Sequence, residues 1–210
     1  SFTELDKASG AVAMGLTEKG VQSEDSVAFM LKRDIRLIPV MLGIAKTGAA
    51  FIPVDPMYPM DRVKYILEDS GAKYLISSKD VESAAGYEYL EADDLLACNG
   101  EGFVPPQISQ GQTHRGIVNI VRPQNNPFNR DITENGNGIV AIGSICFDIS
   151  LYEIFVTLFN GLFVELGNEK AMLDSGELAK HISRHGADFL HCTPSRVASY
   201  LANPEFAEAL

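Results

Sequence analysis

The sequence contains no tryptophan and only three cysteines among its 210 residues. Cys98, Cys146 and Cys192 are odd in number, and none of them lies in a Cys-x-x-Cys pair. A disulfide framework or a zinc site is therefore not expected. Reduced thiols are typical of cytoplasmic proteins, so we expect a cytoplasmic location.

Long hydrophobic runs are also missing. No apolar stretch approaches the about 20 residues that a membrane-spanning helix requires. The first six residues, SFTELD, lack the basic segment followed by an apolar stretch that marks a signal peptide. They begin an amphipathic helical pattern instead. We therefore expect neither a membrane partner nor a secretory leader.

Basic residues are scarce, with 17 Lys and Arg against 28 Asp and Glu, and the formal net charge is -11. Because nucleic-acid binding needs clustered Lys and Arg, we expect no nucleic-acid partner. This charge does not exclude ATP, since one basic side chain and a few backbone amides can hold a triphosphate. Three common signatures are absent, G-x-x-x-x-G-K-[ST], G-x-G-x-x-G and G-x-S-x-G.

The sequence does contain an alternation of short apolar runs and amphipathic segments. It predicts strands at residues 26–31, 51–54, 73–77, 139–142, 162–166 and 188–191. It predicts helices at residues 2–16, 35–46, 61–69, 114–122, 151–159, 175–185 and 194–201. This order is typical of βαβ units, so we expect an α/β fold with parallel sheets and flanking helices. The pattern weakens over residues 78–112, and residues 123–138 are rich in Asn, Pro and Gly, which predicts a loop. We therefore expect two blocks, residues 1–112 and 113–210.

Two strand ends carry candidate functional side chains. Asp148 follows an apolar strand and opens an amphipathic helix, where helix capping is its favoured role. The alternative is that it faces a ligand at the carboxyl end of the strand, as in open α/β sheets. Ile149 and Tyr152 share a helix face and could line the same pocket. His191 lies at a second strand-to-helix corner, either as a pocket wall or as a hydrogen-bonded core residue, and the core role is favoured.

Two other segments are assigned structural roles. Residues 46–56 (KTGAAFIPVDP) contain no nucleophile, base or metal ligand, and their small residues favour close packing of a helix on a strand. His181 and His185 have the i,i+4 spacing of some metal sites, but the helix reads as surface-exposed and no further ligand lies at suitable spacing. We expect no metal site.

Three stretches carry a resemblance to a known family. They are residues 46–69 (KTGAAFIPVDPMYPMDRVKYILED), residues 147–155 (FDISLYEIF) and residues 114–119 (HRGIVN). They resemble K-x-G-x-A-[YF]-[VI]-P-[LVI]-D with P-x-Y-P-x-[DE]-R, F-D-x-S-x-x-E-[MI]-F, and H-[RK]-G-[LI]-x-N. These motifs belong to the adenylation domains of nonribosomal peptide synthetases, in the adenylate-forming, AMP-binding superfamily. The resemblance covers nearly the whole chain as the N-terminal portion of such a domain.

The resemblance implies an amino-acid site. Asp148 matches the aspartate that binds the substrate's α-ammonium group, which reverses the preference for capping. Ile149, Tyr152 and His191 match pocket positions, and the series Asp, aliphatic, aromatic, His is similar to pockets that select serine. The implied partners are an amino acid, a carrier protein with phosphopantetheine, and neighbouring synthetase domains. The parent domain would be a ligase that uses ATP and Mg²⁺.

The sequence departs from the family at one internal point. Members have a loop of the form [YF]-T-S-G-[ST]-T-G-x-P-K-G before the H-R-G segment, whereas here residues 108–113 (ISQGQT) run directly into His114. We therefore expect no tight ATP or Mg²⁺ binding and no adenylation by this chain alone. The alternatives are a truncated, non-catalytic scaffold in a peptide megasynthase and an unrelated flavodoxin-like nucleotide-binding domain. The motif matches make the flavodoxin-like alternative the weakest.

Overall fold

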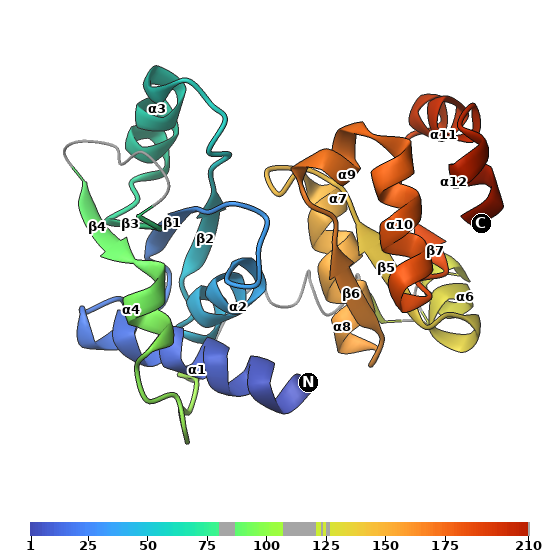
Figure 1. Cartoon of the computed structure of the whole chain (residues 1–210). Coiled ribbons are helices and arrows are strands. Elements are labelled where there is room, and N and C mark those ends of the chain that lie inside the picture. Colours follow the sequence, from blue (N-terminus) through green and yellow to red (C-terminus); the bar gives the residue numbers. More distant parts are fainter. Residues whose placement is uncertain (80–86, 107–120, 123, 125–126, 210) are drawn as a thin grey trace. The chain divides into compact units, whose positions relative to one another are not determined.

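The chain divides into two compact units, Ser1–Gly111 and Gln112–Leu210, each of which is described by itself (Figure 1). The computed structural model describes residues 1–79, 87–106, 121–122, 124 and 127–209. Each unit holds one parallel sheet flanked by helices. The predicted α/β fold class is therefore confirmed.

The first unit is built on a four-stranded parallel sheet in the order β2-β1-β3-β4. Its strands are β1 (Ser26–Met30), β2 (Ala50–Pro53), β3 (Tyr74–Ser77) and β4 (Glu88–Glu91). Its helices are α1 (Phe2–Glu18), α2 (Leu37–Lys46), α3 (Met60–Ser70) and α4 (Ala92–Leu96).

Local sequence explains these elements. Ser1 caps α1 in a reciprocal capping box with Glu4, in which the Ser1 hydroxyl accepts from the Glu4 backbone N–H and the Glu4 carboxylate accepts from the terminal amino group of Ser1. Helix α3 ends at Gly71, whose φ of 62° is left-handed and favours glycine. One face of the sheet packs against α3, with Ala28, Met30, Val54, Val63, Leu67, Ala72 and Leu75 forming the core.

The second unit is built on a three-stranded parallel sheet in the order β6-β5-β7. Its strands are β5 (Gly138–Ala141), β6 (Phe163–Leu166) and β7 (Phe189–Leu190). Its helical segments are α6 (Pro127–Asn135), α7 (Asp148–Leu151), the π-helix η2 (Tyr152–Val156), α8 (Thr157–Phe159), α9 (Glu169–Leu173), α10 (Ser175–His185), α11 (Pro194–Leu201) and α12 (Pro204–Ala209).

The core of this unit lies between the sheet and helices α9 to α12. Val140 and Ile142 from the central strand region pack with Leu178 and Ile182 of α10 and with Phe206 of α12. Helix α10 packs against both α9 and α12. This packing fixes the central strand β5, and hence the segment that follows it.

Several expectations for the secondary structure were wrong. The Asn-, Pro- and Gly-rich stretch predicted as a loop contains helix α6. Proline is compatible with the first turn of a helix, and buried Asn129 and Ile132 give α6 an inward face. Strand β4 and the short helices α4, α9 and α12 were not predicted. The helix expected at residues 114–122 falls almost wholly outside the described residues.

In the described part of the chain, no helix is both long enough and apolar enough to cross a membrane. The longest helix, α1, has 17 residues and carries charged side chains.

Candidate functional site

The candidate site lies where the chain reverses its direction of travel across the second sheet. From β5 the chain crosses to β6 on one side, and it later returns to β7 on the other side. The carboxyl ends of β5 and β7 therefore flank a topological switch point, which is where open α/β sheets bind ligands. Asp148, Ile149 and Tyr152 follow β5, whereas His191 follows β7.

The turn after β5 is held by a buried carboxylate. Glu153 is fully buried, and its side chain accepts hydrogen bonds from the backbone N–H groups of Ile142 at 3.3 Å and Gly143 at 3.0 Å. A Cβ atom at Gly143 would lie 2.8 Å from Glu153 Oε2 and 2.7 Å from Ile149 Cγ2. A side chain at position 143 would therefore have to displace the Ile149 and Glu153 side chains, which favours glycine there.

Ser150 secures the other end of this turn. Its hydroxyl donates to the carbonyl oxygens of Phe147 at 2.7 Å and Ile145 at 3.3 Å, and the residue is 1% exposed. The serine and the glutamate of the F-D-x-S-x-x-E motif thus both bind backbone groups. They fix the position from which Asp148 and Ile149 extend.

Tyr152 and His191 are brought together by the fold. Their rings meet edge to face, with centroids 5.4 Å apart and an interplanar angle of 68°. The Tyr152 hydroxyl donates to Oδ1 of the buried Asn129 on α6. Burial raises the pKa of the Tyr152 phenol, so the hydroxyl keeps its proton at neutral pH.

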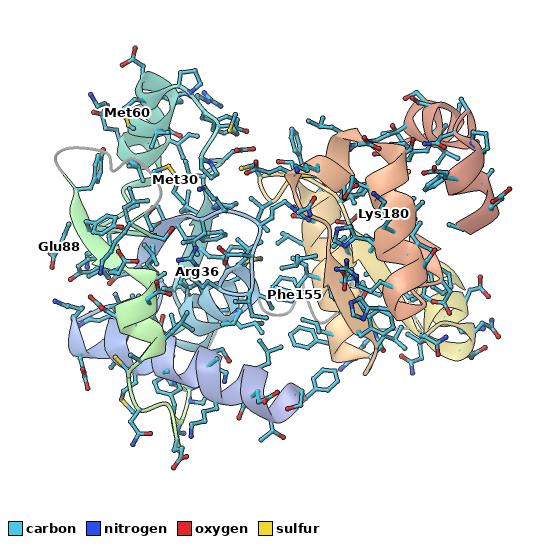
Figure 2. All side chains as sticks on the ribbon, in the orientation of Figure 1. Met30, Arg36, Met60, Glu88, Phe155 and Lys180 are labelled. Atoms are coloured by element: carbon cyan, nitrogen blue, oxygen red, sulfur yellow. The ribbon has the colours of Figure 1, made fainter. Side chains whose placement is uncertain are left out.

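Tyr152 also begins the π-helix, a local widening that often occurs at functional sites. Phe155, labelled in Figure 2, lies on the same π-helix and stacks on Phe159 at 5.5 Å between ring centroids. Phe155 is 3% exposed, whereas Tyr152 is only partly buried. Phe155 therefore anchors the π-helix in the interior, and Tyr152 lies at the switch point.

Asp148 is exposed at the first position of α7. The N-cap residue is Phe147, and no side chain caps the helix, so the capping role first favoured for Asp148 is wrong. Within the described residues, no hydrogen bond or ion pair to the Asp148 carboxylate is found. Ile149 is partly buried beside Gly143.

Cys192 is adjacent to His191 but is not a nucleophile candidate. Burial raises the pKa of its thiol, which keeps the sulfur protonated and poorly reactive. The described cysteines are free thiols.

The two histidines of α10 were expected on an exposed helix, and this expectation was wrong for His181. Its side chain is 12% exposed, and its Nδ1 lies 2.6 Å from Oε1 of Glu165 on β6. His185 Nε2 lies 3.3 Å from the other oxygen of the same carboxylate. These contacts join α10 to the edge strand.

The described residues do not fit Mg²⁺. Among them, no group of three His, Cys, Asp or Glu side chains is arranged to hold a metal ion. The junction at residues 108–114, where the family's phosphate loop would be expected, lies outside the described residues, as does the whole HRGIVN segment. We therefore derive no chemical step through a nucleotide or a metal.

Two residues of this site were missed in the sequence. Glu153 could have been found, because it is the glutamate of the F-D-x-S-x-x-E motif. Asn129 carried no signal, because its helix lies in a stretch whose composition predicts a loop.

Comparison with known proteins identifies the class of the chain. Residues 1–101 match the family model described as AMP-binding enzyme. Surfactin synthase subunit 2 from Bacillus subtilis (strain 168) is 28% identical over 99% of this chain, and the chain spans only 6% of that protein's length.

Solved structures share the fold. The N-terminal subdomain of Klebsiella oxytoca NpsA, in complex with anthranilyl-AMSN, superposes with a TM-score of 0.82 at 24% identity, over 100% of this chain and 57% of that one. The alpha-methyl-L-serine-AMP bound form of the nonribosomal peptide synthetase FmoA3 gives a TM-score of 0.82 at 21% identity, over 97% of this chain and 26% of that one.

Over residues 1–101 the chain thus matches the AMP-binding enzymes. More particularly, it corresponds to the N-terminal portion of an adenylation domain of the nonribosomal peptide synthetase type, which confirms the resemblance seen in the motifs.

Proposed function

We propose that the second unit holds the amino-acid end of an adenylation site, with Asp148 binding the α-ammonium group of the substrate. One observation carries this proposal: Asp148, Tyr152 and His191 all follow strands that flank the switch point of the sheet. An exposed carboxylate at this place can form a charge-assisted hydrogen bond with an ammonium group. In this proposal, residues 1–112 and 113–210 are the two subdomains of the adenylation core.

The reaction of an intact domain would join an amino-acid carboxylate to the α-phosphate of ATP. The products are aminoacyl-AMP and pyrophosphate, and the aminoacyl group then passes to the phosphopantetheine thiol of a carrier protein. The chain's own residues contribute binding and orientation of the amino acid. Other groups must position and neutralise the phosphates, and the family's phosphate loop is missing from this sequence.

We further propose a serine-like substrate. The partly buried Tyr152 and His191 place a hydroxyl group and an imidazole ring together, and both groups can hydrogen-bond a small hydroxylated side chain. FmoA3 binds alpha-methyl-L-serine-AMP and NpsA binds anthranilyl-AMSN, so this fold accepts different substrates. The choice of serine therefore rests on the four pocket residues.

Binding of L-serine to the chain, followed by NMR titration, tests the ammonium role. Asp148→Ala should weaken binding by about 10-fold or more, because hydrogen bonds to charged groups contribute about 1.5–3 kcal/mol. Glu169→Ala is a matched control, since Glu169 is an exposed acidic residue at the first position of α9 in the same unit. Equal serine binding by Asp148→Ala and the unmodified chain would show that Asp148 does not have this role.

The second candidate function is a truncated adenylation-like domain that serves as a scaffold. The direct run from residues 108–113 into His114 favours it, because the family's phosphate loop is missing there. A scaffold has no need of an amino-acid site. Serine binding that depends on Asp148 supports the first candidate, and no binding of any amino acid supports the scaffold.

A further inference from the structure

Asn129 occupies an unusual position for a polar side chain. It is 0% exposed on α6, and its Oδ1 accepts a hydrogen bond from the Tyr152 hydroxyl. The two residues are 23 positions apart in the sequence, so the contact depends on the packing of α6 against the π-helix. A buried amide is costly to place unless its hydrogen bonds serve the fold or a site.

This hydrogen bond decides whether the Tyr152 phenol donates or accepts a hydrogen bond towards other groups. A tyrosine hydroxyl has one proton, and here that proton is directed at Asn129. Any further hydrogen bond that the phenol oxygen makes must therefore be accepted from a donor. The edge-to-face contact with His191 restricts rotation of the ring and keeps the oxygen in this orientation.

We propose that Asn129 is a positioning residue that makes Tyr152 a hydrogen-bond acceptor, so that the site favours amino acids whose side chain donates a hydrogen bond. The inference rests on the proposed function. It adds a criterion to the serine-like specificity: the pocket distinguishes donor side chains from side chains that can only accept. A serine hydroxyl meets the criterion, whereas an ether or a methyl group does not.

The test uses matched pairs of ligands on the 210-residue chain. L-Serine is compared with L-alanine, and O-methyl-L-serine is compared with L-norvaline, which has the same shape but no ether oxygen. Dissociation constants come from NMR titration. The unmodified chain should bind serine about tenfold more tightly than alanine, the effect of one hydrogen bond, and should not prefer O-methyl-L-serine over norvaline.

Removal of the Asn129 acceptor should change this pattern selectively. In Asn129→Leu the phenol can turn its proton towards the ligand. The affinity for O-methyl-L-serine should therefore rise about tenfold relative to the affinity for norvaline. Tyr152→Phe should reduce the preference for serine to what His191 alone supports, and it should give no gain in affinity for the ether. A merely structural role of Asn129 would weaken all four ligands equally.

The double variant Asn129→Leu with Tyr152→Phe removes both groups of the buried hydrogen bond. It gives a second measurement if the single variant Asn129→Leu does not fold. It should match Tyr152→Phe alone, because Asn129 acts only through Tyr152. If folded Asn129→Leu keeps the same ratio of dissociation constants for O-methyl-L-serine and norvaline as the unmodified chain, this inference is overturned. The proposed function still stands in that case, provided that serine binding depends on Asp148. If the unmodified chain binds no amino acid, the proposed function fails and the inference fails with it.

Discussion

At the residue scale, Glu153 is the side chain on which the geometry of the site most depends. Its carboxylate accepts from two backbone amides in a fully buried position. In Glu153→Gln an amide nitrogen would face these N–H groups, which leaves a donor without an acceptor. The free energy of unfolding should fall by about 1–3 kcal/mol.

Urea denaturation measures this loss, with Glu169→Gln as the control, because Glu169 is exposed. An unchanged urea midpoint for Glu153→Gln would mean that the turn after β5 does not depend on the carboxylate. Serine binding should weaken together with stability, since the turn positions Asp148.

Asp25 gives a residue-scale prediction about pH. Lys73 Nζ donates to its carboxylate at 2.9 and 3.0 Å, and the Gln22 backbone N–H donates at 2.9 Å. The hydrogen bond from Lys73, followed by that from Gln22, lowers the pKa of Asp25 below its ordinary value of 3.8. A lowered pKa gives stabilisation that is present above pH about 3.8 and is lost as the pH falls through the folded-state pKa.

Asp25→Asn should therefore destabilise the chain at pH 7 by about 0.5–1 kcal/mol, because the Lys73 side chain is largely exposed. The difference from the unmodified chain should disappear at the acid end of a pH series of thermal melts. A destabilisation that stays constant down to pH 2 would assign the effect to something other than the carboxylate charge.

The sequence allowed the individual pocket residues to be proposed because they occupy motif positions. Asp148, Ile149, Tyr152 and His191 were all named from the motifs, and the fold brings Tyr152 and His191 into contact. The contact between Tyr152 and Asn129 could not be foreseen. It joins two helices whose packing depends on the tertiary structure, and one of them lies in a stretch predicted as a loop.

At the element scale, the segments with strong periodicity were predicted and the short ones were not. Helices α3 and α10 bury residues at helical spacing, and α1 and α2 each bury a longer continuous stretch. Strand β4 has four residues, EYLE, which do not alternate and carry a glutamate at each end, and α4 and α9 have five residues each. Elements this short are stabilised by tertiary packing, and local pattern carries little information about them.

Helix α10 offers an element-scale prediction. Asp174 caps it, since its Oδ1 accepts from the backbone N–H groups of Gly176 at 2.7 Å and Glu177 at 3.2 Å. Asp174→Ala should lower the free energy of unfolding by about 1 kcal/mol, the usual contribution of an N-cap. Asp174→Ser retains a capping oxygen and should restore most of the loss in urea denaturation. Equal stabilities for Asp174→Ala and Asp174→Ser would contradict a capping role.

At the scale of the whole molecule, the sequence contains the motifs of one end of a catalytic site and lacks those of the other. The amino-acid motif lies on described helices beside a switch point, whereas no phosphate loop precedes the H-R-G segment. Transfer of the adenylyl group of ATP to a carboxylate, with pyrophosphate as the leaving group, depends on positioning and on neutralisation of charge. We therefore expect binding without chemistry.

The whole-molecule prediction is that the 210-residue chain shows no ATP–pyrophosphate exchange dependent on an amino acid, although it binds L-serine. The exchange requires both half-sites, because pyrophosphate must attack a bound aminoacyl-AMP. A closely related catalytic adenylation domain, assayed alongside, serves as the positive control. Serine-dependent exchange well above the blank would overturn the prediction, because it would show that this chain positions and neutralises phosphates with groups other than the family's loop. Serine binding without exchange would mean that amino-acid recognition and phosphate chemistry can be separated within this fold.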